Sequence, residues 1–392
     1  MKSKLKNSFS LSEWSGSVGD LGTLLPLAFA LVIVNGYPPE RLFLMWGIVY
    51  VISGWFYKVP VSVQPLKAMA VIAIAKGYSL EMLSAAAFFY GILLIFLSST
   101  GLLSYLKKFF TPALVKGIQL GIGLILAQKA IELIFDKGIL LNVDSTSLGL
   151  NIFMLLTAVA LIAFLQIKYK VPAALILILT SVAFFKLIGY NPDLGFESAK
   201  FLAFTFPDFS MLLDAIIFLI LPQLPLTLGN AVYAANDICH DLWGKQAAKV
   251  TPKRLGFSIG LSDLFIGLLG SFPVCHGSGG MGAHSQFGAK TGGATIIIGT
   301  ILIFLALTAY SSFLFFIPVP LLAAMLLFDS YRMMIMVRKL SANFHIAVAL
   351  VVGLTSFFTR NLTVALIAGI ILEYGYKFLT NRLKLKLERQ AQ

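Results

Sequence analysis

Two glycine- and proline-rich stretches decide the fold of this chain: KVPVSVQPLKAMAVIAIAKG at residues 58–77 and SFPVCHGSGGMGAHSQFGAKTGG at residues 271–293. Each begins with an extended Pro-Val segment and continues into a hydrophobic segment that is too short, or too rich in small residues, to cross a bilayer alone. They lie at corresponding points of the two halves of the chain. Paired broken segments of this kind are typical of inverted-repeat transporters, where helix ends and unwound backbone form a substrate site near mid-membrane.

The composition is that of an integral membrane protein. Of the 392 residues, 58% are hydrophobic and only 12% are charged, which is far from the balance of a soluble domain. The net charge of +13 gathers at the ends of apolar segments, which indicates positive-inside topology and contacts with anionic lipid rather than nucleic-acid binding. No cleavable signal peptide is expected, and Cys239 and Cys275 are too few for a disulfide framework.

The apolar segments predict an all-α polytopic membrane protein with fourteen transmembrane segments, because an apolar helix needs about 20 residues to cross. Residues 1–200 form a first repeat of seven and residues 201–392 a second, inverted repeat of seven, with no soluble C-terminal domain expected. The broken segments are the third and the tenth. The predicted segments are residues 17–36, 40–57, 60–77, 80–103, 111–134, 147–167, 171–189, 209–235, 253–270, 272–289, 293–311, 317–335, 343–359 and 361–379.

Basic and acidic connections alternate along this order of segments. The side that holds both basic termini also receives Lys107, Lys108, Lys168, residues 245–254 and residues 332–339, whereas the opposite side receives Glu132, Asp136 and Asp208. Because basic loops stay on the cytoplasmic side, both termini are predicted to be cytoplasmic, in the plasma (inner) membrane. The predicted partners are therefore a substrate and the lipid bilayer, with a homodimer as an open alternative.

The first broken segment carries a cation where one is physically unfavourable. Pro65 suits the first position of a helix, with Gln64 at its cap and Lys67 in its first turn. A helix N-terminus is already positive, and a lysine near mid-bilayer costs about 2.5–3.5 kcal/mol on insertion scales. A bound anion would offset that cost. The alternative is that Lys67 extends to the cytoplasmic face.

The second broken segment combines polar side chains with glycines that leave backbone amides free. Its candidate substrate-binding residues are His276, Gly277, Ser278, Gly279, Gly280 and Gln286. Glycine lets the backbone approach a ligand, and consecutive free N–H groups form anion-binding nests. Tight helix crossing without any ligand is the alternative, although crossing alone does not call for the polar residues.

Further candidates lie in the first and eighth segments, which correspond under the predicted repeat. Gln223 and Asn230 are candidate substrate ligands in the eighth. Asp20, in the first, is a candidate site for a coupling ion or proton, because ionisable groups inside membranes are functional by default; capping of a helix N-terminus is an equally good account. Asp263 and Glu373 are expected to be packing or interface charges.

Both broken segments contain sequence motifs that are similar to those of a known family. PVCHGSGGMGAHSQFGAKTGG and PVSVQPLKAMAVIA resemble the two signatures of the molybdate transporter family, and GDLGTLLPL near the start extends the likeness over almost the whole chain. Lys290 departs from the family's usual arginine, which keeps the charge but loses bidentate geometry. The family is a distant relative of the sulfate permeases, which share a seven-plus-seven inverted-repeat fold with the uracil permeases. The mid-membrane arginine of the sulfate permeases would fall near Met281 and is missing, so Lys67 is inferred to supply that charge.

The resemblance implies secondary active transport of a tetrahedral oxyanion, molybdate first, bound between the N-termini of half-helices 3 and 10 during alternating access. A sulfate transporter, a nucleobase permease or an anion channel on the same fold are the alternatives. Against a nucleobase permease, the carboxylates that such permeases tend to present in their eighth and tenth segments are absent here, where Gln223 and Asn230 stand instead. A metalloenzyme using Cys275, His276 and His284 is disfavoured, because adjacent ligands chelate poorly from one helix. No enzymatic activity, cofactor or metal is expected.

Overall fold

The computed structural model describes residues 6–136, 138–140, 148–169, 171–190, 204, 206–308 and 310–390. The boundary predicted between the two repeats, at residues 200 and 201, lies outside these residues. The elements of the first half are α1 (Leu11–Ser17), α2 (Leu21–Asn35), α3 (Pro39–Tyr57), β1 (Gln64–Pro65), α4 (Lys67–Lys76), α5 (Leu80–Thr100), α6 (Leu102–Leu106), α7 (Pro112–Asp136), α8 (Leu148–Phe164) and α9 (Ala173–Leu187). A 3-10 turn, Val18–Asp20, joins α1 to α2, and a π-helical turn, Leu165–Tyr169, extends α8.

The elements of the second half are α10 (Leu212–Asp214), α11 (Leu221–Leu226), α12 (Ala234–Trp243), α13 (Pro252–Leu268), β2 (Val274–Cys275), α14 (Ser278–Gln286), α15 (Gly293–Leu307), α16 (Val319–Met334), α17 (Asn343–Thr359) and α18 (Leu362–Gln390). Two π-helical segments, Ala215–Ile220 and Thr227–Tyr233, connect α10, α11 and α12 into one long helix. Pro222 and Pro225 lie within α11. Because proline lacks the N–H that an α-helix needs at interior positions, it locally widens the helix.

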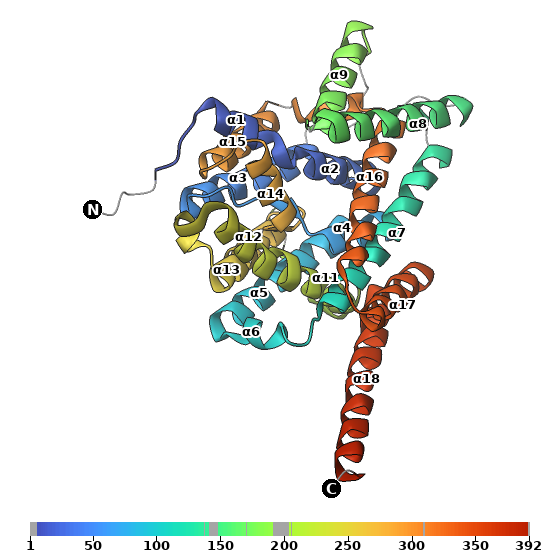
Figure 1. Cartoon of the computed structure of the whole chain (residues 1–392). Coiled ribbons are helices and arrows are strands. Elements are labelled where there is room, and N and C mark those ends of the chain that lie inside the picture. Colours follow the sequence, from blue (N-terminus) through green and yellow to red (C-terminus); the bar gives the residue numbers. More distant parts are fainter. Residues whose placement is uncertain are drawn as a thin grey trace.

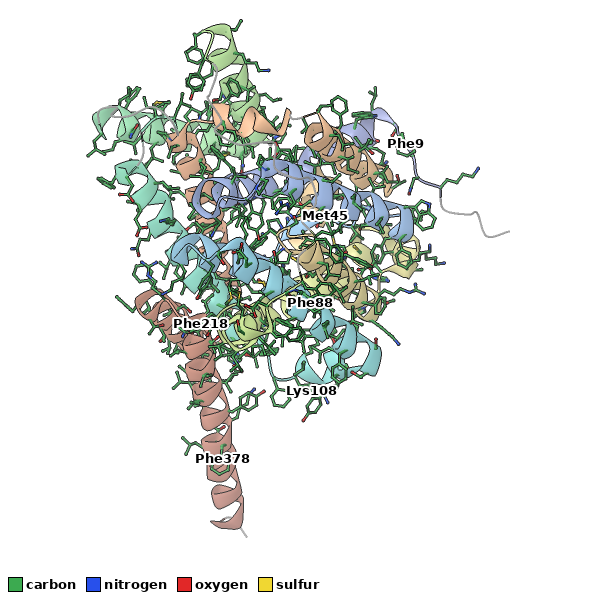
Figure 2. The ribbon with its side chains drawn as sticks, turned by 180° about the vertical axis from the view of Figure 1, so that it is seen from behind. Phe9, Met45, Phe88, Lys108, Phe218 and Phe378 are labelled. Carbon is green, nitrogen blue, oxygen red and sulfur yellow. The ribbon has the colours of Figure 1, made fainter. Side chains whose placement is uncertain are left out.

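The helices are those of a multi-pass membrane protein. Every one of the fourteen predicted segments contains a helix. Within the described residues, six helical stretches are long and apolar enough to cross a membrane, and α8, α9, α15 and α17 are shorter apolar helices. Large apolar side chains face outwards: Trp55 and Phe153 are each 66% exposed and Phe358 is 77% exposed. Figure 2 shows Phe378 on the part of α18 that projects from the rest of the molecule. Such a surface suits lipid and not water.

The helices form two bundles, which lie on the left and right of Figure 1. In the core bundle, α3 packs against α15 and α5 against α13. In the gate bundle, α7 packs against α16 and α17, and α17 against α18. Glycine permits the closest approach inside the core bundle, where a Cβ on Gly47 would lie 2.7 Å from the carbonyl oxygen of Gly299. The bundles meet where α16 contacts α2 and where α4 contacts α7.

The two broken segments meet between the bundles as a short antiparallel pair of strands. Gln64 pairs with Cys275 and Pro65 with Val274. The side chain of Asp263 on α13 is fully buried, and its Oδ1 accepts a hydrogen bond of 2.7 Å from the Val274 amide. The expectation that Asp263 is a packing charge is consistent with this contact. The strands turn directly into α4 and α14.

The cap predicted for the first broken segment is wrong by two residues. Gln64 and Pro65 belong to β1, and α4 begins at Lys67 after Leu66. The strand pairing explains the shift, because the Leu66 amide donates to the Pro273 carbonyl at 3.0 Å and holds the chain extended through Leu66. Lys67 is nevertheless in the first helical turn, as predicted.

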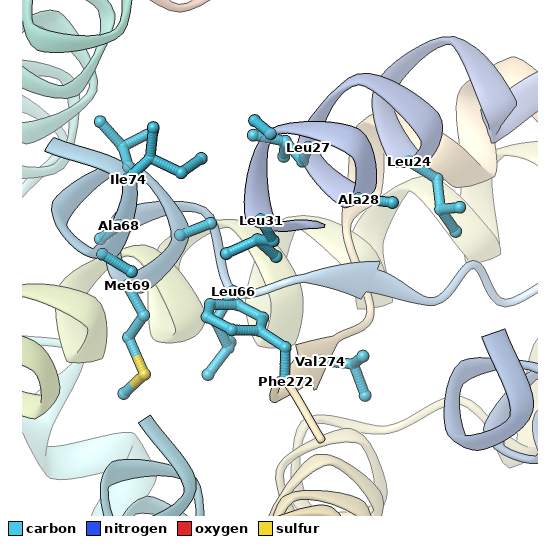
Figure 3. Close-up of a cluster of buried hydrophobic side chains, with 14 of the residues drawn as sticks. Leu24, Leu27, Ala28, Leu31, Leu66, Ala68, Met69, Ile74, Phe272 and Val274 are labelled. Atoms are coloured by element: carbon cyan, nitrogen blue, oxygen red, sulfur yellow. The ribbon is translucent and has the colours of Figure 1, made fainter. Parts of the chain in front are cut away.

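A hydrophobic cluster fixes α2 and α4 relative to the strands. Figure 3 shows its side chains: Leu24, Leu27, Ala28 and Leu31 from α2, Leu66, Ala68, Met69 and Ile74 from α4 and the residue before it, and Phe272 and Val274 from the second broken segment. All of these residues are at most 1% exposed. Burial of side chains such as Leu contributes about 1.5–3 kcal/mol each to the stability of the fold. The cluster therefore holds the broken segments in place against α2.

Candidate functional site

A cavity of about 550 Å³ lies between the bundles, at the starts of α4 and α14. Eight of the residues predicted from the sequence line it: Asp20, Gln64, Lys67, Gln223, Asn230, Ser278, Gly279 and Gln286. They come from four separate stretches of the chain. The two broken segments and the first and eighth predicted segments therefore converge on one site.

Lys67 is the first residue of α4 and is half-buried in the cavity wall. The described residues place no carboxylate oxygen within ion-pairing distance of its amine. The next two amides of α4 are not free, because Ala68 and Met69 donate to Oε1 of Gln223 at 2.9 and 3.2 Å. Gln223 also donates from Nε2 to Oγ1 of Thr227 at 3.1 Å. Gln223 is thus a helix cap supplied by α11, and the positive group that α4 offers to the cavity is the Lys67 side chain.

The start of α14 faces the cavity without a side-chain cap. The residue at the cap position is Gly277, which has no side chain that could accept a hydrogen bond from the first amides of the helix. Gly279 is exposed to the cavity, and the first amides of a helix have no acceptor within it. Ser278 donates from Oγ to Oδ1 of Asn230 at 2.6 Å. The positive end of the α14 dipole is therefore open to a ligand.

Asp20 lies in the middle of the helical stretch Leu11–Asn35 and is 3% exposed. Its Oδ1 accepts a hydrogen bond from Nε2 of Gln64, and its Oδ2 accepts one of 3.1 Å from the hydroxyl of Tyr50. It makes no capping bond to its own helix. The helix-cap interpretation of Asp20 is therefore wrong, and its carboxyl instead links the first predicted segment to the first broken segment.

Three predicted residues lie beside the cavity rather than in its lining: His276, Gly277 and Gly280. His276 is 2% exposed; its Nε2 is 2.9 Å from Oγ of Ser258, and its Nδ1 is 2.9 Å from the carbonyl oxygen of Ser62. Both ring nitrogens thus have protein partners. A Cβ on Gly277 would collide with the side chain of Gln64, so glycine is required there by the close approach of the two broken segments.

Sequence reasoning missed the residues that the gate bundle brings to the cavity. Asp329 and Arg332 of α16 and Lys339 of the following 3-10 turn, Ile335–Lys339, all line it. Asp329 is 5% exposed. An acid inside the apolar segment VPLLAAMLLFDSYRMM is a signal of function that was visible in the sequence. The cavity has a formal net charge of +1, because three basic residues and two acidic residues among those described line it: Lys67, Arg332 and Lys339, and Asp20 and Asp329.

Comparison with known proteins identifies the chain. A family model described as "Molybdate transporter of MFS superfamily" matches residues 12–126 and 215–333, which include both broken segments. The chain belongs to this molybdate transporter family. Among curated members, "Molybdate transporter 2" of Arabidopsis thaliana is 26% identical, over 94% of this chain and 88% of that one.

Solved structures share the fold of this molybdate transporter family member. The transmembrane domain of the cyanobacterial bicarbonate transporter BicA aligns with a TM-score of 0.66 at 17% identity, over 94% of this chain and 100% of that one. The murine anion transporter Slc26a9, in its inward-facing state, aligns with a TM-score of 0.68 at 16% identity, over 97% of this chain and 70% of that one. At such identities the likeness concerns the fold alone.

Proposed function

We propose that the chain is a secondary active transporter of a tetrahedral oxyanion, molybdate first and tungstate or sulfate next. The observation that carries this proposal is the cavity between two helix starts, one bearing Lys67 and the other offering the free amides of α14. Family membership and the 26% identical molybdate transporter support molybdate as the first candidate. The net positive charge of the cavity favours a dianion over a neutral nucleobase.

The proposed anion lies between Lys67 on one side and the amides of Ser278 and Gly279 on the other. Gln64, Asn230 and Gln286 line the same cavity, and their amide groups supply further hydrogen-bond donors. A lysine is suited to this role because its ammonium presents three donors that adapt to a tetrahedral ligand. Gln223 contributes indirectly, since it caps α4 and keeps Lys67 at the cavity wall.

Movement of the core bundle against the gate bundle would be the transport step. The two broken segments belong to the core bundle, whereas α16 closes the other side of the cavity. Arg332 and Lys339 are exposed where they line the cavity, and both belong to the basic connections that the charge pattern assigns to the cytoplasm. The cavity would therefore be open to the inside.

The helix contacts support a seven-plus-seven inverted repeat of fourteen segments; the cytoplasmic placement of the termini rests on the charge pattern of the connections. Under the repeat, segment 2 corresponds to segment 9 and segment 4 to segment 11. The pairing of α3 (segment 2) with α15 (segment 11) therefore has its counterpart in the pairing of α13 (segment 9) with α5 (segment 4). Likewise, the pairing of α8 with α16, segments 6 and 12, has its counterpart in that of α17 with α7, segments 13 and 5. A chain of two interlocked repeats would have this pattern.

Competition for the cavity tests the proposed substrate class. Binding of radiolabelled molybdate to the purified protein is expected to be displaced by tungstate at similar concentrations and by sulfate at higher ones, because all three are tetrahedral dianions of different size. Uracil is expected to leave it unchanged at a 100-fold excess (about 2.7 kcal/mol of discrimination or more). Displacement by uracil but not by tungstate would favour the nucleobase permease alternative instead.

A further inference from the structure

The cavity contains a buried carboxyl to which the proposed transport step gives no role, that of Asp329 on α16. The side chain is 5% exposed and lines the cavity from the gate bundle. Its Oδ2 is buried and has no hydrogen-bond partner among the described residues. A buried carboxylate with an unpartnered oxygen is costly. A proton on the carboxyl removes the charge and so lowers that cost.

The two carboxyls of the cavity differ in their surroundings. Asp20 accepts hydrogen bonds from Gln64 and Tyr50, and such donors favour the charged form of a carboxyl. Asp329 has no comparable donor for Oδ2. Both oxygens of Asp20 already accept a hydrogen bond, whereas Oδ2 of Asp329 can carry a proton without competing with an existing donor.

Among the described residues, four other charged groups line the cavity with Asp329. Lys67 from α4, Arg332 from its own helix and Lys339 from the turn Ile335–Lys339 are of opposite charge to an ionised carboxyl, and Asp20 is of like charge. The side chains that face the same cavity from α2, from α7 and from the turn Leu165–Tyr169 are neutral: Thr23, Gln119 and Gln166. A dianion bound at Lys67 would neutralise a cation that favours an ionised Asp329 and would add like charge to the same cavity.

We propose that Asp329 takes up one proton when the cavity binds its dianion. The proton comes from water on the open face of the cavity, forms the O–H bond of the Asp329 carboxyl, and returns to water when the anion leaves. Binding of anion and proton are then mutually favourable, since a coupling between two sites is reciprocal. This inference rests on the proposed anion site and assigns a proton site to the gate bundle.

Proton uptake and the pH dependence of affinity test this inference on the full-length purified protein. Addition of saturating molybdate in weak buffer is expected to raise the pH of the wild-type sample above that of a protein-free blank. The Kd for molybdate is expected to rise by about tenfold or more from pH about 6 to about 8, because one linked proton changes affinity by up to tenfold per pH unit. Asp329→Asn is expected to bind molybdate with less than about a twofold change over the same range.

Two further variants make the result specific to Asp329. Asp329→Glu keeps a titratable carboxyl and is expected to retain the pH dependence. Asp241→Asn, an exposed acid on α12, is the matched control. Wild-type binding without proton uptake would overturn the inference and leave the anion site standing, as would an unchanged pH dependence in Asp329→Asn. Absence of molybdate binding at every pH would overturn the anion site and the inference together.

Discussion

Replacement of Lys67 by alanine is expected to reduce molybdate uptake into proteoliposomes to background. Lys67 is the cation that begins α4 inside the cavity, and the amides behind it are already bound by Gln223. Removal of the amine leaves that side of the anion without a donor. A charge-assisted hydrogen bond contributes about 1.5–3 kcal/mol, and more where it is desolvated, so the loss in uptake at low molybdate is expected to be about 100-fold or greater.

Lys76→Ala is the matched control, because Lys76 ends the same helix and is exposed outside the cavity. That variant is expected to transport at the wild-type rate. Lys67→Arg is expected to retain partial uptake, since it keeps the charge but changes the shape of the donor group. Wild-type uptake by a well-folded Lys67→Ala protein would remove Lys67 from the site.

The substitution Gly279→Asp is expected to abolish molybdate uptake without destabilising the fold. Nothing lies within 4 Å of a Cβ placed on Gly279, so the side chain has room in the cavity. A carboxylate near a helix N-terminus contributes about 0.3–1 kcal/mol of stability. The same carboxylate would compensate the positive end of α14 and repel a dianion. Uptake in proteoliposomes and thermal unfolding in detergent are the two measurements.

Gly279→Asn is the matched control for this prediction, because asparagine has nearly the shape of aspartate and no charge. The asparagine variant is expected to keep a substantial part of the uptake, whereas the aspartate variant loses it with an unchanged or higher Tm. Equal transport by both variants would mean that the start of α14 does not face the anion. Equal loss in both would mean that bulk, and not charge, excludes the substrate.

Much of the fold could be predicted from local sequence patterns. The lengths of the apolar segments located a helix in every predicted segment, and glycine and proline located the two breaks. The same breaks led to Lys67, Ser278 and Gly279, because a helix that starts inside an apolar stretch must leave amides or charges without partners. These signals are local, so a single sequence contains them.

Non-local contacts account for what the sequence did not predict. β1 pairs with β2 across more than half of the chain, and that pairing moves the start of α4 from Pro65 to Lys67. Gln223 was expected to bind substrate, yet it caps α4. Asp329 was visible as an acid within an apolar segment, but its place at the cavity depends on the packing of α16 against other helices, which the sequence does not show.

The position of the bound anion tests the central proposal most directly. Tungstate has the shape and charge of molybdate, and its heavy atom scatters X-rays anomalously, so crystals grown with tungstate would locate it without assumptions. The expected result is one strong anomalous peak, from tungsten, between the Lys67 amine and the Ser278 and Gly279 amides, with each donor about 3 Å from the nearest tungstate oxygen. A peak elsewhere in the membrane region, with this cavity filled by water alone, would contradict the proposed site.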